Sequence, residues 1–126
     1  MRTSNKKDLG RASGAKLVSS DERRKLYNII NSRTWSDVNY VEAAGGKTLG
    51  GHYHKSTREL IFITKGVVEV EMQNVSTREK KEFYARKRDY FIIEPGWRHT
   101  IRTKTRVSFV QMLSEKYDPK KPDIHD

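Results

Sequence analysis

The sequence predicts an all-β protein built as a sandwich or barrel of short strands. The apolar residues gather in short runs such as 60–63, which suit a buried strand. Turn-forming pairs with glycine follow such runs at 45–46, 65–66 and 95–96. In the stretch 67–72, valines and a methionine alternate with glutamates, as in a strand with one buried face. No convincing long helix interrupts this pattern, so an all-β architecture is favoured.

The predicted strands follow one another with short polar connections. They span residues 25–31, 35–43, 48–54, 59–64, 67–72, 81–84, 90–93, 97–101 and 107–113. The polar stretch 74–80 predicts a loop, and the charged residues 86–89 predict a turn. The start of the first strand is ambiguous, because Ser19 and Glu22 also match a helix capping box. The tyrosine and isoleucines in 25–31 favour a strand there.

Length and composition are consistent with one small domain. The chain has 126 residues, of which 34% are hydrophobic, which supports a single core. Residues 1–16 are polar and basic and predict a disordered tail, with one domain over 17–126. No run approaches the ~18 apolar residues of a membrane span, and the basic start lacks the apolar segment of a signal peptide. With no cysteine for disulfides, a cytoplasmic location is expected.

The chain is strongly basic, with 26 Lys and Arg against 16 Asp and Glu, a net charge of +10. Such a charge attracts anions, and a small anionic substrate is one candidate. No basic platform interleaved with aromatic residues and no helix-turn-helix pattern is present, so neither nucleic acid nor a membrane is an expected partner.

Three of the four histidines predict a metal site together with one carboxylate. His52 and His54 are two residues apart, so on a strand both side chains point to the same face. Glu59 follows after a short turn, and His99 comes from a later strand. Three imidazoles and a carboxylate suit a divalent transition metal, with Fe, Mn, Ni or Zn all acceptable. The alternative is a metal-free pocket in which His52, His54 and His99 act as acids and bases near neutral pH.

This arrangement resembles the cupin family. The first cupin motif is matched at every position by Gly46, His52, His54, Glu59 and Gly66, and residues 89–99 resemble the second motif. The resemblance implies a double-stranded β-helix, also called a jelly roll or cupin barrel. It also implies that His52, His54, Glu59 and His99 are the metal ligands.

Five further side chains near these residues in the sequence are candidates for binding substrate. An arginine at the mouth of a pocket grips a carboxylate or phosphate, and an aromatic ring lines its wall. The candidates are Tyr53, Arg58, Tyr90, Trp97 and Arg98.

A second resemblance concerns sugar-nucleotide ketoisomerases and epimerases with a cupin fold. The stretches 21–23, 50–55 and 113–118 are similar to segments of those enzymes. The resemblance implies an isomerase or epimerase acting on a small anionic sugar nucleotide, with His52, His54 and His99 as catalytic residues. Two alternatives stay open, namely a metal-dependent dioxygenase or other oxidoreductase and a non-catalytic cupin that binds a small ligand.

A homodimer is also expected. Sheet edges with unpaired backbone groups invite a partner strand. The stretches 26–30 and 38–41 are the candidates for pairing with a second copy.

Overall fold

The computed structural model describes residues 10–31 and 33–126, and these residues form strands without any helix. The prediction of an all-β protein is therefore confirmed. The strands are β1 (Gly10–Arg11), β2 (Ser13–Gly14), β3 (Lys16–Ser20), β4 (Lys25–Asn28), β5 (Asp37–Ala43), β6 (Thr48–His52), β7 (Glu59–Lys65), β8 (Val67–Asn74), β9 (Lys80–Arg86), β10 (Asp89–Ile93), β11 (Trp97–Thr103) and β12 (Val107–Leu113). Within the described ranges, no helix has the length and apolar character needed to span a membrane.

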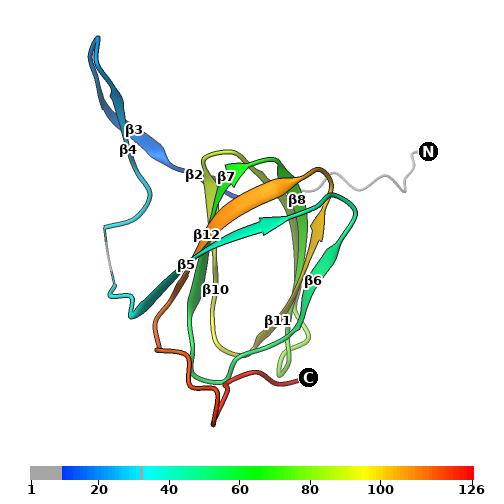
Figure 1. Ribbon diagram of the computed structural model, residues 1–126. Helices are drawn as coiled ribbons and strands as arrows, with labels where there is room; N and C mark the ends of the chain where they lie inside the picture. The colour runs from blue at the N-terminus through cyan, green and yellow to red at the C-terminus, as the bar shows by residue number, and fades with distance from the viewer. Residues whose placement is uncertain (1–9, 32) are drawn as a thin grey trace, which may run out of the picture.

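Two five-stranded sheets curve around a common interior (Figure 1). One sheet has the order β1-β9-β8-β11-β6 and the other has the order β2-β10-β7-β12-β5. From β5 to β12, strands that follow one another in the chain lie in opposite sheets, except that β8 and β9 pair within one sheet. This is the double-stranded β-helix that the sequence predicts.

The apolar core fills one half of the barrel. On β7 and β8, Ile61, Ile63, Val68 and Val70 are almost completely buried, because every second side chain of each strand points inward. Phe109 on β12 belongs to the same cluster. Polar side chains replace apolar ones at the other end of the barrel, and the candidate site lies there.

The predicted boundary of the disordered tail is wrong for residues 10–16. Strand β1 pairs in parallel with β9, and β2 pairs antiparallel with β10. The backbone N–H of Ala12 donates to the carbonyl of Tyr84, and Ala12 also packs against the core. Pairing with a sheet edge uses backbone groups, so it does not require the apolar side chains whose absence suggested a tail. Residues 1–9 lie outside the described residues.

The first predicted strand belongs to a hairpin of β3 and β4, which projects from the barrel (Figure 1). Strand β4 confirms the strand prediction for residues 25–28. Ser19 lies in β3, so it does not cap a helix. Instead Asp21 forms the turn, since its Oδ1 accepts the backbone N–H groups of Arg23 and Arg24 at 2.8 and 3.1 Å.

Candidate functional site

The structure brings together the four residues predicted to bind metal. His52 ends β6, His54 follows it, Glu59 begins β7, and His99 lies in β11 opposite His52. The ring centroid of His52 is 4.7 Å from that of His99 and 5.2 Å from that of His54. The ring centroids of His54 and His99 are 5.3 Å apart. All four side chains therefore face one end of the barrel interior.

A β-bulge directs His52 to the interior. Thr100 on β11 pairs with Gly50 on β6, and the residue before it, His99, pairs with His52. Gly51 therefore has no partner residue in the ladder. Because side chains alternate along a strand, one extra residue reverses the face to which the following residue points. Gly50 and Gly51 both have φ of +84°, a left-handed conformation that glycine adopts at little cost. The glycine pair thus places His52 on the same face as His99.

The carboxylate of Glu59 joins the imidazoles in one buried cluster. Its Oε1 lies 3.1 Å from Nε2 of His54 and 3.7 Å from Nε2 of His99. Its Oε2 accepts a hydrogen bond from the side-chain amide of Gln111 at 2.7 Å. Only 3% of Glu59 is exposed, so a carboxylate at this place depends on these partners.

The surroundings shift the pKa values of all four residues. Burial opposes ionisation of Glu59, but the hydrogen bond from His54, the charge of His99 and the hydrogen bond from Gln111 lower its pKa. Burial also opposes protonation of His54, yet its hydrogen bonds to Glu59 and to a backbone carbonyl raise its pKa. For His52 and His99 burial prevails and the pKa is lowered. The hydrogen-bond partners of His54 thus favour its charged form, whereas burial favours the neutral forms of His52 and His99.

The donor atoms fit a transition metal. The candidate ligand atoms of His52, His54 and His99 all lie within 4.8 Å of one another. Nδ1 of His54 faces the carbonyl of Asp123 at 2.6 Å, and Nδ1 of His99 faces that of Trp97 at 3.3 Å. A carbonyl only accepts, so each Nδ1 carries hydrogen and each neutral ring presents the lone pair of Nε2 to the cluster.

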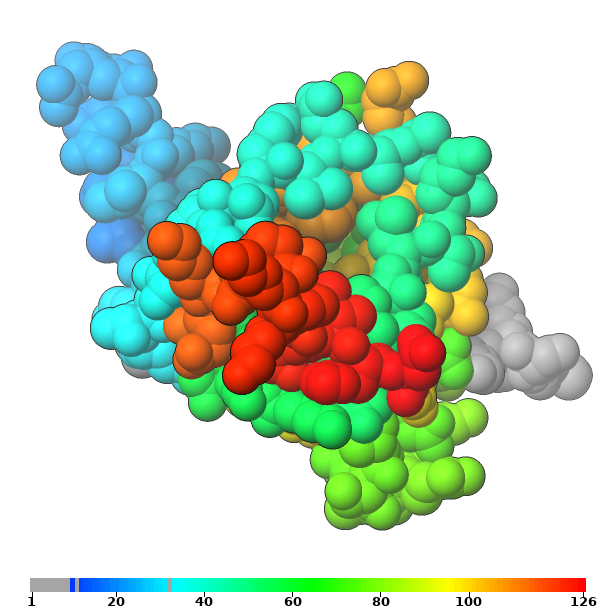
Figure 2. Space-filling model, turned by 60° about the horizontal axis from the view of Figure 1, so that its bottom comes forward, coloured from blue at the N-terminus to red at the C-terminus, as the bar shows by residue number. Residues whose placement is uncertain are grey.

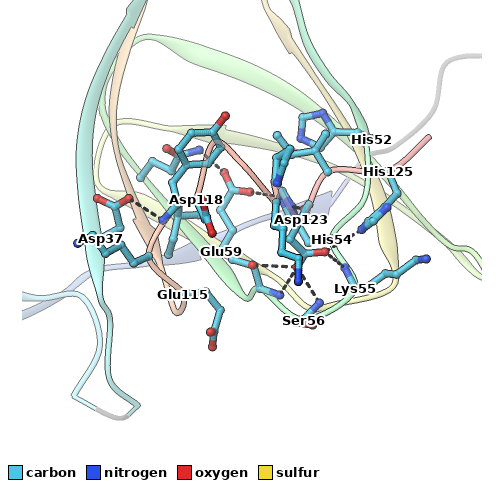
Figure 3. Close-up of a pocket in the computed structure, with 18 of the residues that line it drawn as sticks. Asp37, His52, His54, Lys55, Ser56, Glu59, Glu115, Asp118, Asp123 and His125 are labelled. Carbon is cyan, nitrogen blue, oxygen red and sulfur yellow. Dashed lines mark hydrogen bonds and ion pairs between the residues drawn. The ribbon is translucent and has the colours of Figure 1, made fainter.

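The cluster opens onto two cavities, one of about 890 Å³ and one of about 240 Å³. His52, Glu59 and Gln111 line both of them. Figure 2 shows a hollow at this end of the molecule, and Figure 3 shows His52, His54 and Glu59 on its wall. The larger cavity lies within the size range of small-molecule sites.

The five side chains predicted to bind substrate do not line either of these cavities. Tyr53 lies between two inward-facing histidines, so strand alternation turns it outward, where Arg98 stacks over its ring. Trp97 packs against the core, with Lys81 over its ring. Tyr90 precedes the inward-facing Phe91 and points to the opposite face.

Arg58 is bound elsewhere. Its Nε donates to Glu94 at 2.8 Å, and Glu94 also accepts from Arg33 at 2.9 Å. Proximity in sequence is a poor guide to these side chains, because adjacent residues of a strand face opposite sides.

Several residues of the site are absent from the sequence prediction. Asn39 and Gln111 face the larger cavity from β5 and β12, where they pair with each other across the two strands. Gln111 continues the alternation of Val107 and Phe109, so the sequence places it at an inward position of an apolar strand. A polar residue at such a position was a signal for the site. The stretch 118–125 also contributes residues to the lining of the larger cavity. No sequence pattern marked it.

Comparisons with known proteins agree with this fold. A curated relative from Pseudomonas aeruginosa, UDP-2-acetamido-2,6-beta-L-arabino-hexul-4-ose reductase, is 29% identical over 110 residues. These residues are 84% of this chain but only 30% of the relative, so the chain corresponds to one part of that protein.

Two solved structures have the same barrel. A 3,4-ketoisomerase from Helicobacter canadensis aligns with a TM-score of 0.73 and 14% identity, covering 88% of this chain and 85% of that one. A dTDP-6-deoxy-D-glucose-3,5-epimerase from Legionella pneumophila aligns with a TM-score of 0.71 and 15% identity, covering 86% of this chain and 68% of that one. These likenesses establish the cupin-type fold.

The family model for the polysaccharide biosynthesis C-terminal domain matches residues 19–125, which include the whole histidine cluster and the stretch 118–125. The chain therefore belongs to the polysaccharide biosynthesis C-terminal domain family.

Proposed function

We propose that this chain isomerises or epimerises a 4-keto sugar nucleotide by moving a proton at the carbon beside the ketone. The observation that supports this most is the buried cluster of three imidazoles and a carboxylate beside a cavity of about 890 Å³. The substrate class is supported by the Pseudomonas relative, which is named for a UDP-hexul-4-ose, and by the Legionella epimerase, which holds dTDP-4-keto-L-rhamnose. A net charge of +10 would attract the diphosphate of such a substrate.

The geometry divides the cluster into two roles. His54, His99 and Glu59 would hold a divalent ion, because two Nε2 atoms and Oε1 of Glu59 converge and both rings are oriented by backbone carbonyls. Two histidines and one carboxylate are a set that leaves positions open for substrate, and Fe, Mn, Ni and Zn all accept it. When bound, the ion would supply Lewis acidity toward the ketone oxygen.

His52 would transfer the proton. Its ring borders both cavities, and no hydrogen bond links it to another of the described residues. A ring nitrogen is therefore available to accept the proton from the carbon beside the ketone. Delivery of the proton to the former ketone carbon, with passage of the neighbouring hydroxyl proton to the former ketone oxygen, isomerises the sugar. Protonation of the original carbon from the opposite face inverts that carbon.

The test is incubation of the metal-loaded protein with a 4-keto UDP-sugar in heavy water. We expect the sugar to gain deuterium beside the ketone, measured by mass spectrometry, without consumption of oxygen. Oxygen uptake with ferrous iron would instead identify a dioxygenase or other oxidoreductase. Saturable binding of the sugar without any exchange would identify a non-catalytic binding protein.

We also propose that two copies associate through the β3–β4 hairpin and the edge strand β5. Val38 and Tyr40 on β5 are 61% and 62% exposed, and Leu17 and Val18 on the hairpin are 49% and 58% exposed. A two-stranded hairpin is marginally stable by itself in water, so apolar groups on both elements favour contact with a second copy. We expect light scattering to give twice the mass of one chain and Val38→Lys with Tyr40→Lys to give the monomer. A clean wild-type monomer throughout the micromolar range would contradict this assembly.

A further inference from the structure

The 118–125 segment lies across the open end of the barrel, beside the histidine cluster. Figure 2 shows it at the edge of the hollow, in orange to red, and Figure 3 shows Asp123 and His125 near His54. Six of its residues line the larger cavity: Asp118, Lys121, Pro122, Asp123, Ile124 and His125. The segment is thus a wall of the candidate site.

Asp123 contacts His54 through its backbone. Its carbonyl oxygen lies 2.6 Å from Nδ1 of His54, which donates the hydrogen bond. A carbonyl only accepts, so this contact keeps a hydrogen on Nδ1 and directs Nε2 toward Oε1 of Glu59 at 3.1 Å. The carbonyl of Asp123 therefore sets the ring orientation in which His54 turns Nε2 to the cluster.

The side chain of Asp123 holds the loop that joins His54 to Glu59. Its carboxylate accepts the backbone N–H groups of Lys55, Ser56 and Thr57 at 2.8, 2.8 and 2.9 Å. It also accepts the hydroxyl of Thr57 at 2.9 Å. One carboxylate thus ties the 118–125 segment to every residue from 55 to 57.

A second attachment lies two residues further along the segment. Tyr53 and His125 form a β-bridge, with each backbone N–H donating to the other residue's carbonyl at 2.9 Å. Nε2 of His125 also lies 2.9 Å from Oδ1 of Asp123. His54 is therefore enclosed between two attachment points, one on each side in the sequence.

We propose that Asp123 is a positioning residue, which orients the His54 imidazole so that Nε2 serves as a ligand in the cluster. The carboxylate anchors the segment on residues 55–57, and the anchored backbone carbonyl sets the ring. The metal part of this inference rests on the proposed function, whereas the hydrogen bond to His54 does not. Outer hydrogen-bond partners of a ligating histidine typically contribute about 10–100-fold to metal affinity.

The test compares Asp123→Ala with Asp118→Ala. Asp118 is an acidic residue of the same segment, and its Oδ1 accepts the backbone N–H of Lys120 at 2.9 Å. Heteronuclear NMR of metal-free protein reports the Nδ1–H of His54 and its exchange with solvent. We expect a slowly exchanging Nδ1–H in the wild type and in Asp118→Ala, and faster exchange in Asp123→Ala. In a titration with Zn²⁺ alone, Asp123→Ala should bind about 10–100-fold more weakly than both.

Two further outcomes complete the design. Asp123→Asn keeps the shape and one acceptor oxygen, so it should restore much of the protection of the Nδ1–H and of the Zn²⁺ affinity even if Asp123→Ala fails to fold. Unchanged exchange of the Nδ1–H and Zn²⁺ affinity within twofold of wild type in both Asp123 variants would overturn the proposal. If the wild type binds no Zn²⁺, the proposed metal role fails, and the exchange of the His54 Nδ1–H in the variants alone decides the positioning role.

Discussion

His52→Ala should abolish deuterium exchange into the sugar while the protein keeps its metal ion. In the proposed division of roles, His52 accepts the proton, and a positioned general base contributes about 10²–10⁴-fold to a rate. The ion should stay because His54, His99 and Glu59 still converge on one point. The measurements are the exchange rate by mass spectrometry and the metal content by elemental analysis.

The matched variants are a double change of the metal ligands and a change outside the interior. His54→Ala with His99→Ala should lose both the ion and the exchange. Thr48→Ala, on the exposed part of β6, should keep both. If His52→Ala loses the ion as completely as the double variant, His52 is a fourth ligand, and another group accepts the proton.

Gly50→Ala should reduce stability and metal affinity more than Gly51→Ala. Both residues have φ of +84°, so either alanine incurs the left-handed cost of about 1–2 kcal/mol. A Cβ on Gly50 would also lie 2.7 Å from the carbonyl oxygen of His99, whereas a Cβ on Gly51 meets no atom within 4 Å. The added collision falls on His99, whose ring atom Cδ2 would also lie 3.3 Å from this Cβ, so it displaces a proposed metal ligand.

Thermal unfolding and Zn²⁺ titration of the two variants check this expectation. The shared backbone cost cancels in the comparison, so the difference between the variants reports the contact with His99. Equal midpoints and equal affinities would show that the bulge does not depend on this close approach.

The His52–His54 pair of the cluster was predictable from sequence because its spacing follows a local rule. His52 and His54 are separated by one residue, which turns Tyr53 away and leaves both imidazoles on one side. The alternation in β8 and the apolar run in β7 likewise follow from strand geometry, and both strands form close to their predicted bounds. Such features depend only on neighbouring residues, so the sequence alone predicts them.

The remaining parts depend on contacts between distant residues. Asp123 meets His54 and residues 55–57 only after the barrel has closed, and a lone aspartate in a polar stretch gives no sign of this. Residues 10–14 pair through their backbones, which leaves no pattern in the side chains. Arg58 points to Glu94 rather than to the cavity, because that carboxylate lies within reach on a neighbouring part of the fold.

The central claim is that proton transfer at this cluster depends on a metal ion held in part by Glu59. The most direct measurement is the rate of deuterium exchange by Glu59→Gln as Zn²⁺ is added to chelator-treated protein. The substitution keeps the shape of the side chain and removes its charge, so the ion should bind more weakly. We predict no exchange in chelator and recovery toward the wild-type rate at high Zn²⁺ concentration. Undiminished exchange by Glu59→Gln in chelator, together with its loss in His54→Ala, would contradict the account and assign the reaction to histidine acid–base catalysis without a metal.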